Sequence, residues 1–122
     1  MVLQTEYFKR SEFACKCGCG FDTVDAELLT VLQALRAHFN TVCHIESGCR
    51  CVAYNRRVLG ATDSQHTKGR AADIVVAGVA PAAVQDYLEK NYPEEYGIGR
   101  YQTFTHIDTR TNGPARWTGN GG

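Results

Sequence analysis

The sequence predicts an α+β fold in which helices pack on a small, mostly antiparallel sheet. Its helical patterns are separated from a cluster of short strand patterns, and such a separation is typical of the α+β class. The chain has 122 residues, of which 43% are hydrophobic, which is enough for one core but short for two. We therefore expect a single domain over residues 1–117 and a flexible Gly-rich tail over residues 118–122.

The first helix is expected over residues 23–39. Apolar residues recur there at steps of three and four, which indicates an amphipathic helix with one face on a core. Asp22 and Thr23 are the expected caps at its start. The apolar positions are Val24, Leu28, Leu32, Leu35 and Phe39.

A strand and a short helix follow. Residues 42–47, VCHIES, alternate in polarity and predict a strand that ends at the turn signal Ser47-Gly48. Residues 52–59 predict a short helix, and residues 60–63 predict a loop.

The second half of the chain supplies the remaining elements. Residues 71–78, AADIVVAG, predict a buried strand that ends at Gly78. Proline is tolerated at a first helical position, so Pro81 is expected to start a helix over residues 81–92. Residues 96–102 and 103–110 predict two further strands.

Charge and hydropathy argue against several classes of partner. Lysine plus arginine and aspartate plus glutamate number 13 each, so the overall charge indicates neither a nucleic acid nor an anionic membrane. No apolar run approaches the roughly 18 residues of a membrane span, and the first residues contain no signal-peptide stretch. We expect a monomer that stays in the cytoplasm until it is released.

The stretch SQHTKGRAADI, residues 64–74, contains two good metal ligands, His66 and Asp73. Zinc binds imidazole nitrogen and carboxylate oxygen, and a catalytic site has three protein ligands and one position for water. Gly69, Ala71 and Ala72 would let the backbone turn close to a shared centre. On its own the spacing also fits a surface histidine before a buried strand, so a third ligand is needed.

The chain has three other histidines. His38 lies near the end of the first helix, where a histidine favours the negative end of the helix dipole. His44 lies mid-strand, where packing or hydrogen bonding is more common than metal binding. His106 stands two residues before Asp108, so on a strand both side chains leave from the same face. An imidazole and a carboxylate are therefore expected side by side.

The cysteines leave three alternatives open: disulfides, free thiols or a metal clip. The segments CKCGC and GCRC could pair with each other or bind a structural zinc, but their spacing matches no standard structural zinc site. For a cytosolic protein we prefer unpaired buried thiols. The six residues are Cys15, Cys17, Cys19, Cys43, Cys49 and Cys51.

Several motifs in order resemble peptidase family M15, the zinc D-alanyl-D-alanine carboxypeptidases and related peptidoglycan peptidases, and especially its short phage and bacterial members. These motifs are SGCRCVAYNRRVLGATDSQHTKGRAADI, GIGRYQTFTHIDTR and PARW. The amino-terminal EYFKRSEFACKCGCG and the helical LQALR are similar to the same family, so the resemblance covers nearly the whole chain. It implies a fold like that of Hedgehog and D,D-peptidase domains.

The resemblance implies one catalytic zinc ion held by His66, Asp73 and His106. It also implies that Arg50 binds the carboxylate or carbonyl of the substrate, and that Ser64 and Gln65 shape the same cleft. The expected substrate is a peptidoglycan stem peptide in the cell wall, cut either at its terminal D-alanine or at an internal bond. The family includes phage endolysins, so we expect a zinc metallopeptidase of either the carboxypeptidase or the endopeptidase type.

One position departs from the family pattern. Many members have an acidic general base three residues before the last histidine, where this chain has Thr103. We expect Asp108 to replace that base, because it shares a face with His106, and to take a proton from the attacking water; the alternative is that it orients His106 by a hydrogen bond. A third arrangement would make Asp108 the ligand and His106 its neighbour. The departure also leaves open a non-catalytic, zinc-containing module that binds the cell wall or forms part of a virion, or a structural protein held by a cysteine-bound metal.

Overall fold

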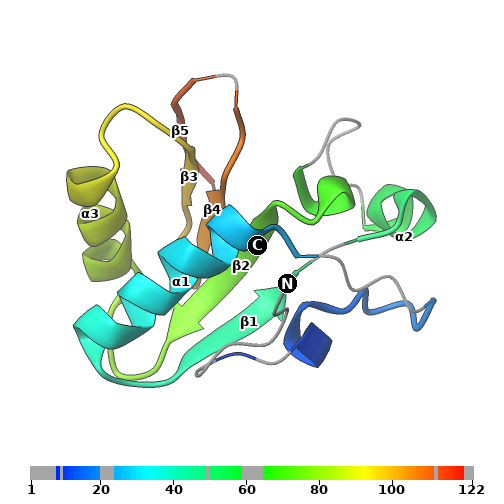
Figure 1. Ribbon diagram of the computed structural model, residues 1–122, viewed down its shortest axis with the longest axis horizontal. Helices are drawn as coiled ribbons and strands as arrows, with labels where there is room; N and C mark the ends of the chain where they lie inside the picture. The colour runs from blue at the N-terminus through cyan, green and yellow to red at the C-terminus, as the bar shows by residue number, and fades with distance from the viewer. Residues whose placement is uncertain are drawn as a thin grey trace.

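A five-stranded sheet in the order β1-β2-β4-β3-β5 forms the centre of the protein, as the computed structural model shows (Figure 1). The structure describes residues 8, 10–19, 24–48, 50–58, 65–111 and 113–119. Neighbouring strands are antiparallel except β3 and β5, which are parallel, so the expected α+β class is confirmed. The strands are β1 (Cys43–Ser47), β2 (Ala71–Val76), β3 (Gly97–Arg100), β4 (Thr105–Asp108) and β5 (Ala115–Thr118).

The first helix, α1 (Ala26–Phe39), begins three residues later than the sequence predicts. The expected caps Asp22 and Thr23 lie outside the described residues. Asp25 is the N-cap, because its side chain accepts a hydrogen bond from the backbone N–H of Leu28 at 3.3 Å. At the other end Asn40 adopts a left-handed conformation with φ 53°, which is typical of a helix C-terminus.

Two other α-helices and two 3-10 helices complete the described structure. α2 (Val52–Arg57) and α3 (Pro81–Asn91) agree closely with the predicted helices, and Pro81 occupies the first turn of α3 as expected. The 3-10 helices η1 (Arg10–Phe13) and η2 (Gln65–Lys68) were not predicted, because one turn leaves no periodicity to detect. Figure 1 shows α1 and α3 against the sheet, with α2 and η2 grouped beyond its other end.

Side chains alternate between the two faces of the sheet, and this separates the core from everything else. One face carries Ile74, Ile98 and Ile107, which are 1%, 0% and 0% exposed. They pack with buried residues of α1 and α3 in a single apolar cluster. The opposite face carries the residues next along each strand, including Asp73, His106 and Asp108, because successive side chains of a strand point to opposite sides.

Register aligns one row of residues across all five strands on this second face. Asp73 pairs with Ser47 of β1 and with His106 of β4. His106 pairs in turn with Gly99 of β3, and Gly99 pairs with Trp117 of β5. The row therefore brings together residues that are widely separated in the sequence.

The sequence predicts the carboxyl-terminal strands imperfectly. It predicted strands that meet at residues 102 and 103, whereas residues 101–104 form the turn between β3 and β4. Gln85 holds this turn, because its side-chain amide donates to the carbonyls of Tyr101 and Phe104. β5 was missed, and Thr118, which was assigned to a flexible tail, is its last residue. The N–H of Gly119 also donates to the carbonyl of Arg100 at 2.8 Å.

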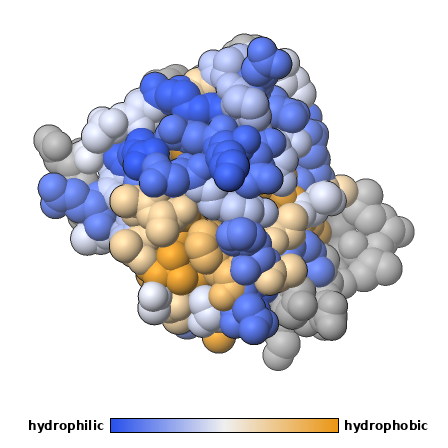
Figure 2. Space-filling view, turned by 90° about the vertical axis from the view of Figure 1, so that its left-hand side faces the viewer, coloured by the Kyte–Doolittle hydropathy of each residue, from blue (hydrophilic) through white to orange (hydrophobic). Residues whose placement is uncertain are grey.

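The surface is mixed in character. Seen from the side on which α3 lies in Figure 1, hydrophilic side chains gather over the upper part and apolar side chains form a patch below them (Figure 2). Within the described part of the chain, no helix combines the length and the apolar character that a membrane span requires.

Candidate metal centre

His66, Asp73 and His106 meet on the second face of the sheet. His66 comes from η2, Asp73 from β2 and His106 from β4. The Oδ1 atom of Asp73 lies 3.4 Å from Nε2 of His66 and 3.0 Å from Nδ1 of His106. One nitrogen from each ring and a carboxylate oxygen all lie within 4.8 Å of one another. Two imidazoles and one carboxylate form the ligand set of a catalytic zinc site.

Local backbone geometry explains how His66 reaches the sheet. Gly69 follows η2 with φ 69°, a left-handed conformation that favours glycine. The carbonyl of Gly69 accepts from the N–H of Asp25 at 2.8 Å, which fixes this turn against the start of α1. Ala72, expected to leave space near the centre, lies instead in the apolar core on the other face of β2. Its small side chain therefore packs in the apolar core and not beside the candidate ligands.

The protonation of the His66 ring is fixed by its neighbour. Nδ1 lies 2.6 Å from the carbonyl oxygen of Gly48, and a carbonyl only accepts, so Nδ1 carries the proton and donates. Nε2 faces Asp73 and is the nitrogen that remains for a metal. The ring is buried, with 3% of the residue exposed. A hydrogen bond at the opposite ring nitrogen is what orients a metal-binding histidine.

His106 is flanked by a carboxylate at each ring nitrogen. Nδ1 faces Asp73, while Nε2 lies 2.7 Å from Oδ2 of Asp108. Burial disfavours the charged ring, but the hydrogen bonds to Asp108 and Asp73 outweigh it and raise the pKa of His106. Without a metal, both ring nitrogens face carboxylate oxygens that can accept a proton from them. A cation beside Asp73 would replace the proton on Nδ1, and Nε2–H would still donate to Asp108.

Asp108 is completely buried and its hydrogen-bonding capacity is filled. Oδ1 accepts from the backbone N–H and from Nε of Arg110, at 3.2 and 2.8 Å. Oδ2 accepts from His106 and from an Nη of Arg110, at 2.7 Å in each case. Burial raises the pKa of Asp108, but the hydrogen bonds from Arg110 and His106 hold it well below its usual range. Asp108 is not one of the grouped ligands, so the alternative in which it replaces His106 as ligand receives no support.

Asp73 is an ionised carboxylate at the middle of the centre. Burial raises its pKa, but hydrogen bonds from His106 and then His66 outweigh burial and hold the pKa well below its usual range. The guanidinium of Arg50 adds a further positive charge, since one Nη lies 3.5 Å from Oδ2 of Asp73. The carboxylate is thus held in its ionised form, which is the form that binds a metal.

Arg50 is held in place from three directions. Its Nη1 donates to the side chain of Asn55 at 3.0 Å, its Nε donates to Ser47 Oγ at 3.4 Å, and its backbone N–H donates to the carbonyl of His66 at 2.9 Å. Asn55 and Ser47 were not predicted as site residues. Ser47 could have been found from the strand pattern, because it ends β1 on the same row as Asp73.

Trp117 and two glycines shape the rest of this face. The indole of Trp117 lies against the ring of His106, with centroids 5.0 Å apart, and Arg110 lies over the indole at 5.3 Å. Gly99 leaves room for this indole, since a Cβ there would lie 2.6 Å from its Nε1. Gly97 leaves room for Asp108 and Arg110 in the same way.

The remaining predicted residues are distributed as follows. Ser64 lies outside the described residues. Gln65 begins η2, and its carbonyl accepts from the N–H of Arg70 at 3.1 Å. His38, in the last turn of α1, stacks on Tyr87 of α3 with ring centroids 4.4 Å apart. His44 is exposed on β1 rather than packed. Neither His38 nor His44 is grouped with the candidate ligands.

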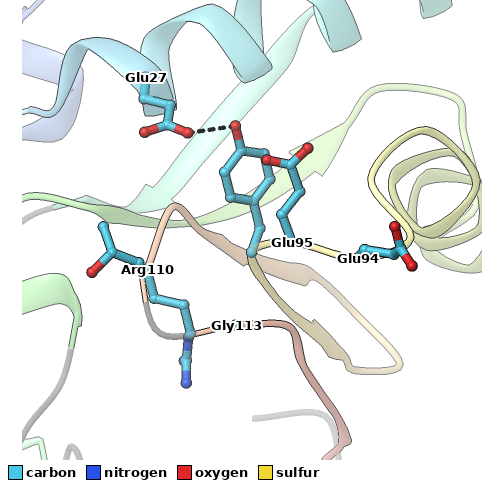
Figure 3. Close-up of a pocket in the computed structure, with 7 residues that line it drawn as sticks. Glu27, Glu94, Glu95, Arg110 and Gly113 are labelled. Carbon is cyan, nitrogen blue, oxygen red and sulfur yellow. Dashed lines mark hydrogen bonds between the residues drawn. The ribbon is translucent and has the colours of Figure 1, made fainter.

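A separate hollow of about 300 Å³ is lined in part by Arg110 (Figure 3). The hydroxyl of Tyr96 donates to Glu27 there at 2.6 Å, which links the start of β3 to α1. None of the three candidate metal ligands is among its described lining residues, so it is distinct from the centre. The lining residues are Glu27, Glu94, Glu95, Tyr96, Arg110, Thr111 and Gly113.

Comparison with known proteins adds one finding. A family model described as Peptidase M15 matches residues 6–108, which is more than half of the chain. This span includes His66, Asp73, His106 and Arg50, the residues that the structure brings together. No curated protein matches the chain.

Proposed function

Because the chain belongs to peptidase family M15, a family of zinc metallopeptidases, we propose that it hydrolyses peptide bonds in the stem peptides of peptidoglycan. The observation that supports this most directly is the group formed by His66, Asp73 and His106. Each histidine is held by a hydrogen bond at one nitrogen and directs the other toward the same carboxylate. We further propose that the protein acts on the cell wall as an endolysin.

The donor set fits zinc by its chemistry. Imidazole nitrogen and carboxylate oxygen are preferred zinc ligands, and three protein ligands leave one position open. A zinc ion bound there supplies a Lewis acid that lowers the pKa of water and polarises a carbonyl. The contribution of the chain is to orient both ligand nitrogens, through hydrogen bonds from the opposite ring nitrogens to Gly48 and Asp108.

Arg50 is the proposed substrate-binding residue. Its guanidinium lies beside Asp73 and is only partly exposed, with 14% of its side chain accessible. A guanidinium can bind a carboxylate through two parallel hydrogen bonds, and it can also stabilise the negative charge that develops on a carbonyl oxygen during hydrolysis. The contacts with Ser47 and Asn55 hold it in the orientation that this role requires. Ser64 and Gln65 remain proposed as residues that shape the same cleft.

We assign Asp108 to the orientation of His106 rather than to proton transfer. The carboxylate accepts two hydrogen bonds at each oxygen, and it faces the ring nitrogen opposite to Asp73. A general base must reach the water whose proton it takes, and this position does not support that.

The test combines metal content with product identification. Wild type, His66→Ala and, as a matched control, His44→Ala are purified, and zinc bound at this centre is measured. Each is then incubated with purified peptidoglycan, and the released fragments are identified by mass. We expect His66→Ala to lose one zinc ion and all cleavage, as a three-ligand site requires. His44→Ala should keep both, because His44 is exposed on β1. The released fragments would also identify the bond that is hydrolysed. Free D-alanine would indicate a terminal cut, and new internal termini would indicate an endopeptidase.

One observation favours a second candidate, a non-catalytic, zinc-containing module that binds the cell wall or forms part of a virion. Thr103, exposed in the turn before β4, stands where many M15 members have an acidic residue, and the hydrogen bonds of Asp108 are filled. Zinc that depends on His66, without cleavage of any peptidoglycan, would replace the peptidase proposal with this one.

A further inference from the structure

Four cysteines form a second group of potential metal ligands, separate from the centre described above. The sulfur atoms of Cys15, Cys17, Cys19 and Cys51 all lie within 4.8 Å of one another. Sγ of Cys17 is 3.5 Å from that of Cys15 and 3.7 Å from that of Cys51. Three of these residues follow η1, and the fourth directly precedes α2, so the group joins two distant parts of the chain.

The separations match a metal site better than a set of disulfides. Zinc–sulfur bonds of about 2.3 Å in a tetrahedron place the sulfur atoms about 3.8 Å apart. The measured 3.5 and 3.7 Å are close to this spacing. These four cysteines are free thiols, and Cys17 lies near two partners at once, whereas a disulfide joins only two.

Backbone N–H groups already point at two of the sulfur atoms. The N–H of Cys51 donates to Sγ of Cys15, and the N–H of Tyr54 donates to Sγ of Cys51, at 3.4 Å in both cases. Such bonds stabilise thiolates, which are the form that binds metal.

The segments that carry the cysteines are held together without a metal. Phe13 of η1 is 1% exposed and belongs to the apolar core, so it anchors the segment just before Cys15. Gly48, just before the loop that carries Cys51, packs against the backbone of Phe13 so closely that a Cβ there would lie 2.6 Å from its Cα. The four sulfur atoms therefore meet because the fold brings them together.

We propose that Cys15, Cys17, Cys19 and Cys51 bind a second, structural zinc ion through four thiolates. Thiolate sulfur is a soft ligand that selects zinc, and a site with four protein ligands is closed to water and substrate. This ion would tie the amino-terminal segment to the loop that carries Arg50, the residue next to Cys51. The sequence favours unpaired buried thiols, and the four cysteines are unpaired in the structure, but Cys19 is exposed and only Cys15 of the four is buried.

The test measures metal rather than activity. Wild type, Cys17→Ser, His66→Ala and the control Cys43→Ala are purified with a reductant, and zinc per chain is measured by native mass spectrometry. Cys43 is a buried thiol of β1 outside the group, so its replacement removes a cysteine without touching the site. We expect about two zinc ions in wild type and Cys43→Ala and about one in each of the other variants, since each loses one site.

Cobalt identifies the ligands. Cobalt-loaded His66→Ala should retain thiolate-to-metal charge-transfer absorption, which Cys17→Ser should lose. Because this readout does not depend on His66, it separates failure of this proposal from failure of the proposed peptidase. If Cys17→Ser does not fold, Cys19→Ser is used, because Cys19 is exposed. The proposal is overturned if wild type has no zinc that depends on Cys17 or Cys19, or if iron occupies the thiolates instead. It is also overturned if the chain purified without reductant is two hydrogens lighter than the free-thiol form, because this mass difference shows a disulfide.

Discussion

Asp73 and His106 lie directly opposite each other on neighbouring antiparallel strands, with Oδ1 of Asp73 3.0 Å from Nδ1 of His106. The register of the sheet alone therefore brings two of the three candidate ligands together. The third, His66, is added from η2 by a turn at Gly69. The centre is therefore built on two neighbouring strands and η2, and its properties can be tested residue by residue.

Replacing Asp108 distinguishes orientation from proton transfer. If Asp108 orients His106, Asp108→Asn keeps an acceptor for Nε2–H but loses the charge, and we expect zinc affinity to fall about 10- to 100-fold. Activity should then recover when zinc is saturating. The measurement is peptidoglycan turnover against zinc concentration. A variant that stays inactive at full zinc occupancy would restore Asp108 as the general base.

Replacing Arg50 tests substrate binding. We expect Arg50→Ala to lower kcat/KM about 10²- to 10³-fold, as loss of one donor to a developing negative charge does, while zinc content is unchanged. Arg50→Lys should not restore it, because an ammonium lacks the planar fork of the guanidinium. Arg56→Ala, on an exposed position of α2, is the matched control. Equal losses in the Arg50 and Arg56 variants would argue against the assignment.

The metal-free protein should be most stable at mildly acidic pH. The pKa values of Asp73 and Asp108 are lowered in the folded state, so their stabilisation is present above the ordinary value of about 3.9 and is lost as pH falls. The pKa of His106 is raised, so its stabilisation is present below about 6.5 and is lost as pH rises through the raised value. Urea unfolding with a chelator present should show the largest free energy of unfolding between these limits. A free energy that rises steadily into the alkaline range would contradict this.

The close contact between Gly99 and Trp117 predicts a steric effect on stability. A Cβ at residue 99 would lie 2.6 Å from the indole Nε1, so Gly99→Ala should lower the free energy of unfolding by about 1–3 kcal/mol. In the double variant Gly99→Ala/Trp117→Ala the overlap is gone, and the combined loss should be smaller than the sum of the single losses. Simple additivity in urea unfolding would show that the contact does not limit the site.

Patterns that repeat along the chain predicted the structure well, and features that depend on a single contact did not. The three- and four-residue steps identified α1, but its start depended on the hydrogen bond between Asp25 and the N–H of Leu28. β5 was missed because four residues with two exposed side chains give little pattern, and their position depends on pairing with β3.

The candidate site was predictable to a similar degree. The same-face argument placed His106 beside Asp108, and extended by two residues it would also have found Arg110. The side of the ring on which Asp108 lies could not be read from spacing, because it depends on how His106 turns toward Asp73. The grouping of four cysteines was equally hidden, since Cys51 stands 36 residues after Cys15.

The position of β4 has a consequence for synthesis of the protein. β4 lies between β2 and β3 in the sheet, although it follows both in the chain. A chain emerging from the ribosome presents His66 and Asp73 first, and His106 follows 33 residues after Asp73. The third ligand arrives only when the last central strand inserts between two that are already made. A nascent chain thus has a half-built centre, and the capacity to hold a metal with three ligands is acquired late.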